Sequence, residues 1–405
     1  MNAPAPPPPN VPLGELMALT APGAPLPFAV LDSRGRLLLA AGKQLQDAEQ
    51  LNALMERGGC VDPVEAEAAR AAARAAAGGG AAAAGGGGAG TGPVVRQRTW
   101  FDRMERQIWA LDDLLRGLGR GSTQAAQIEA FAEGYIALVE RHPDAALYLC
   151  VRQYDRRFAL YALTHALHTA TVSLLTARQL GWAPEAQRCA VRAALTMNAS
   201  IVELQARMAE QNETPNARQM AQIRAHPQES AQLLRQAGVQ DVEWLQAIEQ
   251  HHERPGGGGY PQGLNEVGTQ AHLLRAADVF TAKISPRAFR APLTTQLAAR
   301  QLFQEEKGGP VAAGLIKAVG VYPPGDFVWL KNGDAGIVVQ RAAPGRGAVV
   351  VSLFGANGRP VPGSPRRDTA QPEFGISGSL AEKANLPRVL PEQVYGLLDQ
   401  EAPPA

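Results

Sequence analysis

Apolar side chains recur at helical spacing through most of the middle of the chain. Met104, Ile108, Leu111 and Leu115 follow one another at intervals of three or four residues, which places them on one face of a helix. The same spacing predicts helices over residues 100–116, 124–140, 145–154, 156–180, 185–208, 217–236, 242–252, 268–283, 292–306 and 310–318. Many helices joined by short connections predict an all-α domain over residues 96–319.

The spacing changes to that of β-strands near the C-terminus. Residues 327–330 and 336–339 are short apolar runs with an Asn-Gly turn signal between them, which predicts a hairpin. Residues 348–353 add another strand. We therefore expect a small β-rich module over residues 320–395.

A second small module precedes the helical domain. Apolar residues 28–31 and 37–39 flank a turn and predict a hairpin. A helix over residues 47–57 follows and ends at a Gly-Gly pair, which is a natural stop signal. The pattern indicates an α+β module over residues 12–62, so the fold class is mainly α with small modules on both sides.

Three stretches lack any apolar period. Residues 1–11 form a Pro-rich tail, residues 63–95 are dominated by Ala and Gly, and residues 396–405 form a short tail. Gly-rich segments bury too little apolar surface to order themselves. The middle stretch is therefore expected to be a linker.

Composition excludes some classes of function. The chain has 39 Lys and Arg against 38 Asp and Glu, so its net charge of +1 predicts no surface for a nucleic-acid polymer. The three cysteines are scattered, without the spacing of a zinc site or a disulfide framework. No run of roughly eighteen apolar residues and no signal peptide are present, which predicts a cytoplasmic protein without a membrane span.

Candidate chemistry is concentrated in residues 250–264, QHHERPGGGGYPQGL. His251, His252 and Glu253 are residues of metal-ligand or acid-base type. Adjacent residues lie about 100° apart on a helix, so two neighbouring histidines cannot both join one apolar stripe. The glycine run before Tyr260 is typical of a loop with special backbone requirements. The stretch predicts a metal or phosphate site, and a solvated helix end with a flexible loop is the alternative.

Further candidate ligands lie on other predicted helices. They are His165, His226, which precedes a proline, and Asp278, which interrupts an apolar run. A buried carboxylate is costly unless it is paired or binds a metal. Imidazoles with a carboxylate suit Fe, Mn, Zn or Ni. A hydrogen-bonded structural role for each histidine is the alternative.

Two motifs carry a family resemblance. HHERPGGGGYPQGL, followed by LLRAADVFTAKISPRAFR, is similar to the signature of the HD-GYP family, a branch of the HD phosphohydrolases. The resemblance covers roughly residues 155–320, and the His226-Pro227 pair also falls at a family position. It implies an all-α HD-type domain with a site of two or three metal ions and hydrolysis of cyclic di-GMP.

The resemblance also implies roles for individual residues. His226, His251 and His252 would belong mostly to one metal ion, and His165 and Asp278 to another. Iron or manganese is the metal that the family implies. Arg287 and Arg290 stand where family members contact a phosphate or a guanine. The loop Gly259-Tyr260-Pro261 is the part that meets partner proteins in the family, including diguanylate cyclases.

The chain departs from the family pattern at the HD pair itself. Met197 stands at the His position, Asn198 at the Asp position, and Ile201 at the position of a usual Lys. A neutral Asn cannot bridge two cations, and Met is a soft ligand that hard divalent metals disfavour. Further departures are Gly256, Thr281 and Phe289. The loss of the bridging carboxylate predicts a crippled two-metal centre.

Three hypotheses follow from these residues. The chain is a degenerate cyclic di-GMP sensor or interaction module with little hydrolysis, retaining one divalent metal ion or none. Alternatively, it is an active metal-dependent phosphodiesterase with an altered site. The third hypothesis is a scaffold that binds proteins and no nucleotide. The Met197-Asn198 pair favours the first and third hypotheses over the second.

Overall fold

The computed structural model describes residues 11–19, 26–31, 37–39, 43, 48–63, 65–67, 69, 99–153, 158–380, 389–396 and 398. The chain divides into two compact units, Met1–Val94 and Val95–Ala405, which are described separately. The expected Pro-rich tail, Ala/Gly-rich linker and C-terminal tail lie almost entirely outside the described residues. Among the residues described, no helix is both long enough and apolar enough to cross a bilayer.

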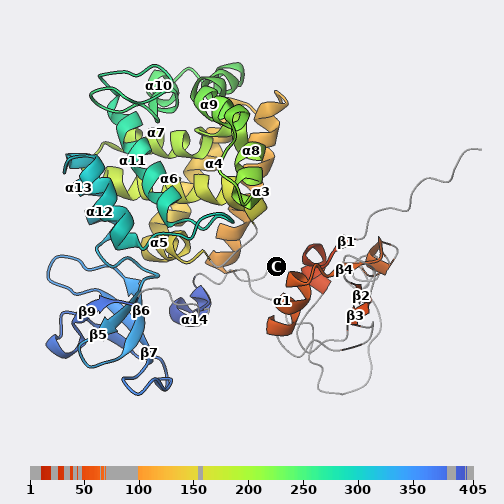
Figure 1. The fold of residues 1–405 in the computed structure, drawn as a ribbon, viewed down its shortest axis with the longest axis vertical. Coiled ribbons are helices and arrows are strands. Elements are labelled where there is room, and N and C mark those ends of the chain that lie inside the picture. Colours follow the sequence, from red (N-terminus) through yellow and green to blue (C-terminus); the bar gives the residue numbers. More distant parts are fainter. Residues whose placement is uncertain are drawn as a thin grey trace, which may run out of the picture. The chain divides into compact units, whose positions relative to one another are not determined.

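In its described residues, the N-terminal unit combines short strands with helical segments (Figure 1). Its elements are β1 (Val11–Pro12), η1 (Leu13–Leu19), β2 (Val30–Leu31), β3 (Leu37–Leu39), α1 (Ala48–Glu56) and β4 (Cys60–Val61). The strands form one sheet in the order β1-β4-β2-β3, and β2 pairs with β3 as an antiparallel hairpin. Leu13, Phe28 and Val61 are fully buried and form the centre of its core.

The second unit is mainly a helical bundle, as the apolar spacing predicts. Its helices are α3 (Trp100–Gly119), α4 (Ala125–Arg141), α5 (Pro143–Val151), α6 (Tyr161–Gln179), α7 (Pro184–Thr196), α8 (Val202–Glu210), α9 (Ala217–Gln236), α10 (Val242–Gln250), α11 (Thr269–Ile284), α12 (Thr295–Glu305) and α13 (Pro310–Val319). Helix α6 is buried on nearly all sides and packs against α7, α11 and α13 (Figure 1). The core therefore surrounds α6, which carries one candidate ligand.

The expected single helix over residues 185–208 is wrong. Helix α7 ends at Thr196, a 3-10 turn (Ala199–Ile201) follows, and α8 begins at Val202. The backbone amide of Ser200 donates to the Ser230 hydroxyl on α9, 3.1 Å away, instead of continuing the helical ladder. This tertiary contact bends the chain directly after Met197 and Asn198, where the family pattern has its HD pair.

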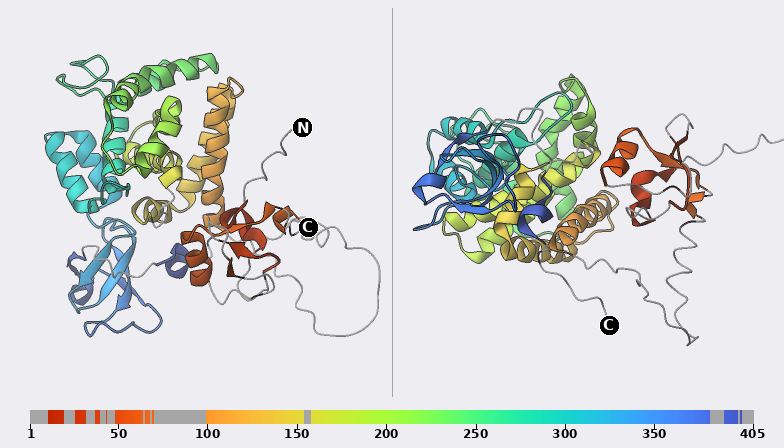
Figure 2. Two further views of the ribbon diagram at one scale, coloured as in Figure 1. Left: turned by 45° about the vertical axis from the view of Figure 1, so that its right-hand side comes forward. Right: turned by 90° about the horizontal axis from the view of Figure 1, so that it is seen from below.

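A five-stranded antiparallel sheet closes the second unit. Its strands are β5 (Phe327–Leu330), β6 (Ala335–Gln340), β7 (Val349–Phe354), β8 (Arg366–Asp368) and β9 (Ile376–Ser379), in the order β8-β7-β6-β5-β9. The sheet lies at one end of the helical bundle (Figure 2), where Phe327 and Ile337 share a buried cluster with Tyr148 of α5. A last helix, α14 (Pro391–Tyr395), packs on the same cluster through Val394. The expected fold class is confirmed.

Candidate metal centre

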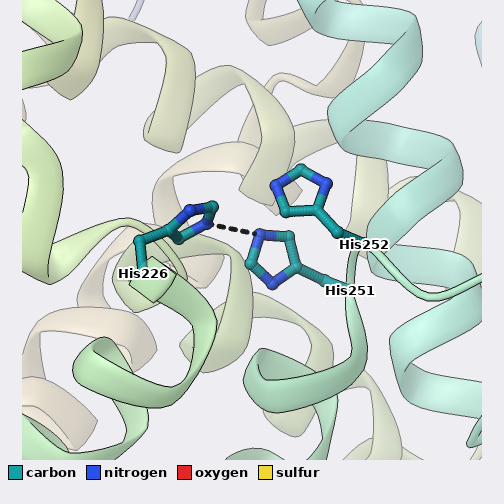
Figure 3. A group of neighbouring side chains, drawn as sticks. All are labelled: His226, His251 and His252. Carbon is teal, nitrogen blue, oxygen red and sulfur yellow. Dashed lines mark hydrogen bonds between the residues drawn. The ribbon is translucent and has the colours of Figure 1, made fainter. Parts of the chain in front are cut away.

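Three histidines, one inside a helix and two in the turn after another helix, converge in the bundle (Figure 3). His226 lies inside α9, and His251 and His252 follow the last residue of α10. One nitrogen from each ring lies within 4.8 Å of the others, and no other such cluster of ligand side chains occurs in the described part of the chain. The expected helix over residues 242–252 is therefore too long by two residues, because His251 and His252 occupy the turn after it.

Backbone carbonyl groups fix the tautomers of His226 and His251. The Nδ1 atom of His226 lies 2.6 Å from the Ile223 oxygen, and that of His251 lies 2.6 Å from the Ile248 oxygen. A carbonyl oxygen only accepts, so both Nδ1 atoms carry the proton and donate it. Each Nε2 atom therefore keeps an unprotonated lone pair.

Each of these two carbonyl groups is free for a local reason. Pro227 has no N–H, so the helical hydrogen bond that residue 227 would make to the Ile223 oxygen is missing. The Ile248 oxygen lies in the last turn of α10, where carbonyl groups have no partner within the helix. The proline after His226 thus leaves an acceptor for the imidazole that precedes it.

The two free Nε2 atoms face each other at 3.1 Å, marked by the dashed line in Figure 3. Two neutral acceptors cannot hydrogen-bond to each other, so a cation bound to both nitrogens would satisfy their lone pairs. Burial lowers the pKa of His226 to about 3 and also lowers the pKa of His251, which disfavours a proton in this place at neutral pH. Two nitrogens about 2.1 Å from one metal, at close to a right angle, lie about 3 Å apart. The residues fit a divalent metal ion.

His252 completes the cluster, and its ring contacts those of His251 and Tyr260. The ring centroids of His252 and His251 lie 4.1 Å apart, and His252 stacks on Tyr260 with centroids 4.5 Å apart and an interplanar angle of 24°. Burial holds the pKa of His252 well below its usual value, so this ring is also neutral. The backbone amide of Tyr260 donates to the His252 carbonyl at 3.2 Å, which ties the glycine-rich loop to the cluster.

His165 and Asp278 form a separate pair beside these three residues. The Nε2 atom of His165 on α6 lies 2.7 Å from a carboxylate oxygen of Asp278 on α11. Burial acts to raise the pKa of Asp278, but the hydrogen bond from His165 and the electrostatic attraction of His165, His252 and His251 together outweigh it, so the net shift of the pKa is downward. Asp278 also interacts electrostatically with His251 and His252, so its negative charge acts on the three-histidine cluster.

The positions of the HD pair contribute neither a carboxylate nor an imidazole. Met197 is fully buried and belongs to the main apolar core, and Asn198 and Ile201 are buried nearby. Thr281, which stands at another substituted family position, bonds through its hydroxyl to the Thr169 hydroxyl at 2.9 Å. Apolar and neutral groups therefore occupy the places where the family pattern has charged ones.

The two candidate nucleotide-binding arginines are adjacent, in the segment after α11. Arg287 and Arg290 pair with each other across an isolated β-bridge. The guanidinium carbon of Arg287 lies 4.7 Å from the ring centroid of Tyr161, and Arg287 also donates to the Tyr161 hydroxyl. Tyr161 in turn stacks on His165 at 5.3 Å and 8°. Side-chain contacts thus connect Arg287 to the His165–Asp278 pair.

Two residues near the site were not selected by sequence reasoning. Tyr161 lies one turn before His165 on α6, and His168 lies one turn after it. Burial, with a contribution from His165, lowers the pKa of His168 to about 3. The three-residue spacing of the two histidines was the available signal for His168.

Glu253 has a different role from the one its residue type suggests. Its carboxylate accepts backbone amides of the glycine-rich loop, 2.6–3.2 Å away, and it is absent from the histidine cluster. The interpretation of Glu253 as a metal-ligand or acid-base residue is therefore replaced by a structural one. A carboxylate directly after two candidate ligands can bond to the loop that follows as readily as to a metal ion.

Fold and site together define a helical domain that gathers histidines and a carboxylate from α6, α9, the turn after α10, and α11. Residues 150–308 match the family model of the HD domain. The cyclic di-GMP phosphodiesterase PA4108 of Pseudomonas aeruginosa is 27% identical over 210 residues, which cover 51% of this chain and 50% of that protein. The chain spans about half the length of this curated relative. The predicted HD domain of HD-GYP type is confirmed.

The chain also matches a solved structure. Bd1817, described as an HDG"Y"P protein from Bdellovibrio bacteriovorus, is 16% identical, with a TM-score of 0.47. The match covers 74% of this chain and 96% of that protein.

Proposed function

We propose that the chain is a cyclic di-GMP-responsive protein of HD-GYP type that holds one divalent metal ion and hydrolyses the nucleotide slowly or not at all. The similarity to a phosphodiesterase over half of the chain supports the ligand class. The HD domain supports a metal-dependent site.

One observation carries the proposal: the three-histidine cluster is intact, and the HD pair is replaced by Met197 and Asn198. Cleavage of a phosphodiester by two metal ions requires both ions to be held close together, one at the attacking oxygen and one at the leaving oxygen. A neutral amide and a thioether supply no bridging charge. The residues of this chain therefore support one metal position and not two.

The metal position suits Fe(II) or Mn(II), as the family implies. His226, His251 and His252 would hold the ion, and the Asp278 carboxylate lowers the energy of a cation in this buried place. When bound, the ion would act as a Lewis acid toward a phosphate oxygen.

Arg287 and Arg290 are the proposed contacts for the nucleotide. A guanidinium group matches both a phosphate and the edge of a guanine through paired N–H donors. We also propose that Gly259, Tyr260 and Pro261 contact a partner protein, a diguanylate cyclase by family analogy. This loop lies against the metal site through the stacking of Tyr260 on His252, so a partner there would sense metal occupancy.

A second candidate function is an active phosphodiesterase with an altered site. The observation in its favour is the His165–Asp278 pair, which remains hydrogen-bonded beside the cluster. Such a pair can orient or deprotonate a water molecule next to a single metal ion. A scaffold that binds no nucleotide is the third candidate, and the same experiment tests all three.

Purified full-length protein is first loaded with Fe(II) or Mn(II) under anaerobic conditions and assayed for hydrolysis of cyclic di-GMP. We expect turnover at least a hundredfold below that of an active phosphodiesterase measured in parallel. Rapid turnover that His252→Ala abolishes would overturn the proposal in favour of the active enzyme.

Calorimetric titration with cyclic di-GMP then tests binding. We expect affinity in the micromolar range that Arg287→Ala weakens about tenfold or more, because a charge-assisted contact to a phosphate is worth roughly 1.5–3 kcal/mol. Tyr135→Phe is the matched control, because it also removes a side-chain hydrogen bond to α6, from the buried Tyr135 hydroxyl to the Leu167 oxygen. It should leave the affinity for cyclic di-GMP unchanged. No binding at tens of micromolar cyclic di-GMP, with or without metal, would support the third candidate function, a scaffold that binds no nucleotide.

A further inference from the structure

The two adjacent histidines lie between two side chains that bind backbone amides. Gln250 precedes them, and its side-chain oxygen accepts the amide of Gly268 at 2.9 Å, at the start of α11. Glu253 follows them and accepts amides of the loop. The last residue of α10 and the turn after it thus hold the segment between the cluster and α11 at two places, residues 262–264 and Gly268.

The Glu253 carboxylate is buried and saturated by backbone groups. One oxygen accepts the amides of Gln262 at 2.6 Å and Gly263 at 3.2 Å, and the other accepts the amide of Leu264 at 3.0 Å. Glu253 is 1% exposed, so these bonds are made away from bulk water. A buried carboxylate is tolerated because such charge-assisted bonds replace its hydration.

These bonds constrain the Tyr260 ring, which stacks on His252. Tyr260 lies two residues before the first amide that Glu253 holds, and its own amide bonds to the His252 carbonyl. The loop is therefore fixed on both sides of Pro261. In this position the Tyr260 ring stacks on His252 and restricts the rotation of that imidazole.

We propose that Glu253 is a positioning residue for the three-histidine site: it binds no metal, and it holds the loop that keeps Tyr260 against His252. This inference rests on the metal site of the proposed function. Residues that orient a metal ligand from outside the coordination sphere typically contribute 10–100-fold to metal affinity. Glu253 acts on His252 through the loop and through the stacked ring.

The test uses chelator-treated full-length protein and titration with Mn(II). Glu253→Gln keeps the size of the side chain but replaces one acceptor oxygen with an NH₂ group, which faces a backbone N–H donor to donor. We expect Mn(II) affinity to fall at least tenfold and amide hydrogen exchange at residues 262–264 to accelerate. Glu249→Gln is the matched control, because Glu249 is one turn earlier on α10 and pairs with Arg235 at the surface. It should change neither quantity.

A second pair of variants keeps the test decisive if Glu253→Gln does not fold. Tyr260→Ala removes the stacked ring and leaves the Glu253 bonds in place, so it should weaken Mn(II) binding to the same extent. Tyr260→Phe retains the ring and should restore the affinity.

The outcomes separate this inference from the proposed function. Faster exchange at residues 262–264 with unchanged Mn(II) affinity in Glu253→Gln would overturn the inference and leave the metal site standing. Unchanged affinity in Tyr260→Ala would do the same. Wild-type protein that binds no Mn(II) would overturn both.

Discussion

Gly259 packs directly against the backbone of Glu253. A Cβ atom added at residue 259 would overlap the Cα atom of Glu253 and stand 2.5 Å from the backbone nitrogen of Arg254. Backbone atoms cannot turn aside as a flexible side chain can. The last glycine of the run is therefore required by close approach of two chain segments, beside the residue that holds the loop.

Gly259→Ala should displace the loop and weaken Mn(II) binding about tenfold or more, because Tyr260 would lose its place on His252. The affinity is measured by calorimetry on chelator-treated protein. Gly134→Ala serves as the control, since its added Cβ meets nothing within 4 Å on the exposed face of α4. That change should leave metal binding intact and stabilise the helix by roughly 0.5–1 kcal/mol.

Pro227→Ala should weaken metal binding although it removes a proline from a helix interior. The new N–H at residue 227 would bond to the Ile223 oxygen, which now accepts the Nδ1 proton of His226. His226 would lose the bond that fixes its tautomer and orientation. We expect α9 to gain stability in urea unfolding and Mn(II) affinity to fall several-fold. Increased affinity, or no change, would contradict the role given to this proline.

Restoring the HD pair should restore a second metal position. In Met197→His with Asn198→Asp, the carboxylate would again supply an anionic bridge and the imidazole a second ligand. We expect bound metal, measured by elemental analysis, to rise from one ion per chain to two, and hydrolysis of cyclic di-GMP to increase at least tenfold. Met197→His alone is the control and should yield neither. Two metal ions already bound to the wild type would contradict the single-metal proposal.

Metal-free protein should lose stability as pH falls below about 6.5. Burial lowers the pKa of His226 to about 3, against about 6.5 in an unfolded chain. Between these values the unfolded chain binds the proton and the folded protein does not, so acid favours unfolding. His226 alone should lower the free energy of unfolding by about 1.4 kcal/mol between pH 7.5 and 5.5.

Urea unfolding of wild type and His226→Gln at the two pH values measures this contribution. The variant lacks the titrating group, so its loss of stability should be smaller by that amount. Equal losses in the two proteins would show that His226 is not held neutral by burial.

The sequence by itself determined the classes of the elements and the place of the site. Helical spacing marked nearly all helices of the bundle, because a face buried in the core must repeat every three to four residues. The HHE motif contains two of the three clustered histidines and stands out in the sequence, because adjacent histidines cannot both join one apolar stripe. The replacement of the HD pair was likewise visible in the residues Met197 and Asn198.

Only the tertiary structure decided how these side chains are partnered. The break after α7 depends on Ser230, which is 30 residues further along the chain than Ser200. His165 meets Asp278 across 113 residues, and Glu253 bonds to the loop and not to the histidine cluster. Local spacing records which face of an element is buried. The choice among several possible partners for a polar group is made by the packing of helices that are distant in sequence, because a buried donor or acceptor takes whichever partner that packing brings within hydrogen-bond distance.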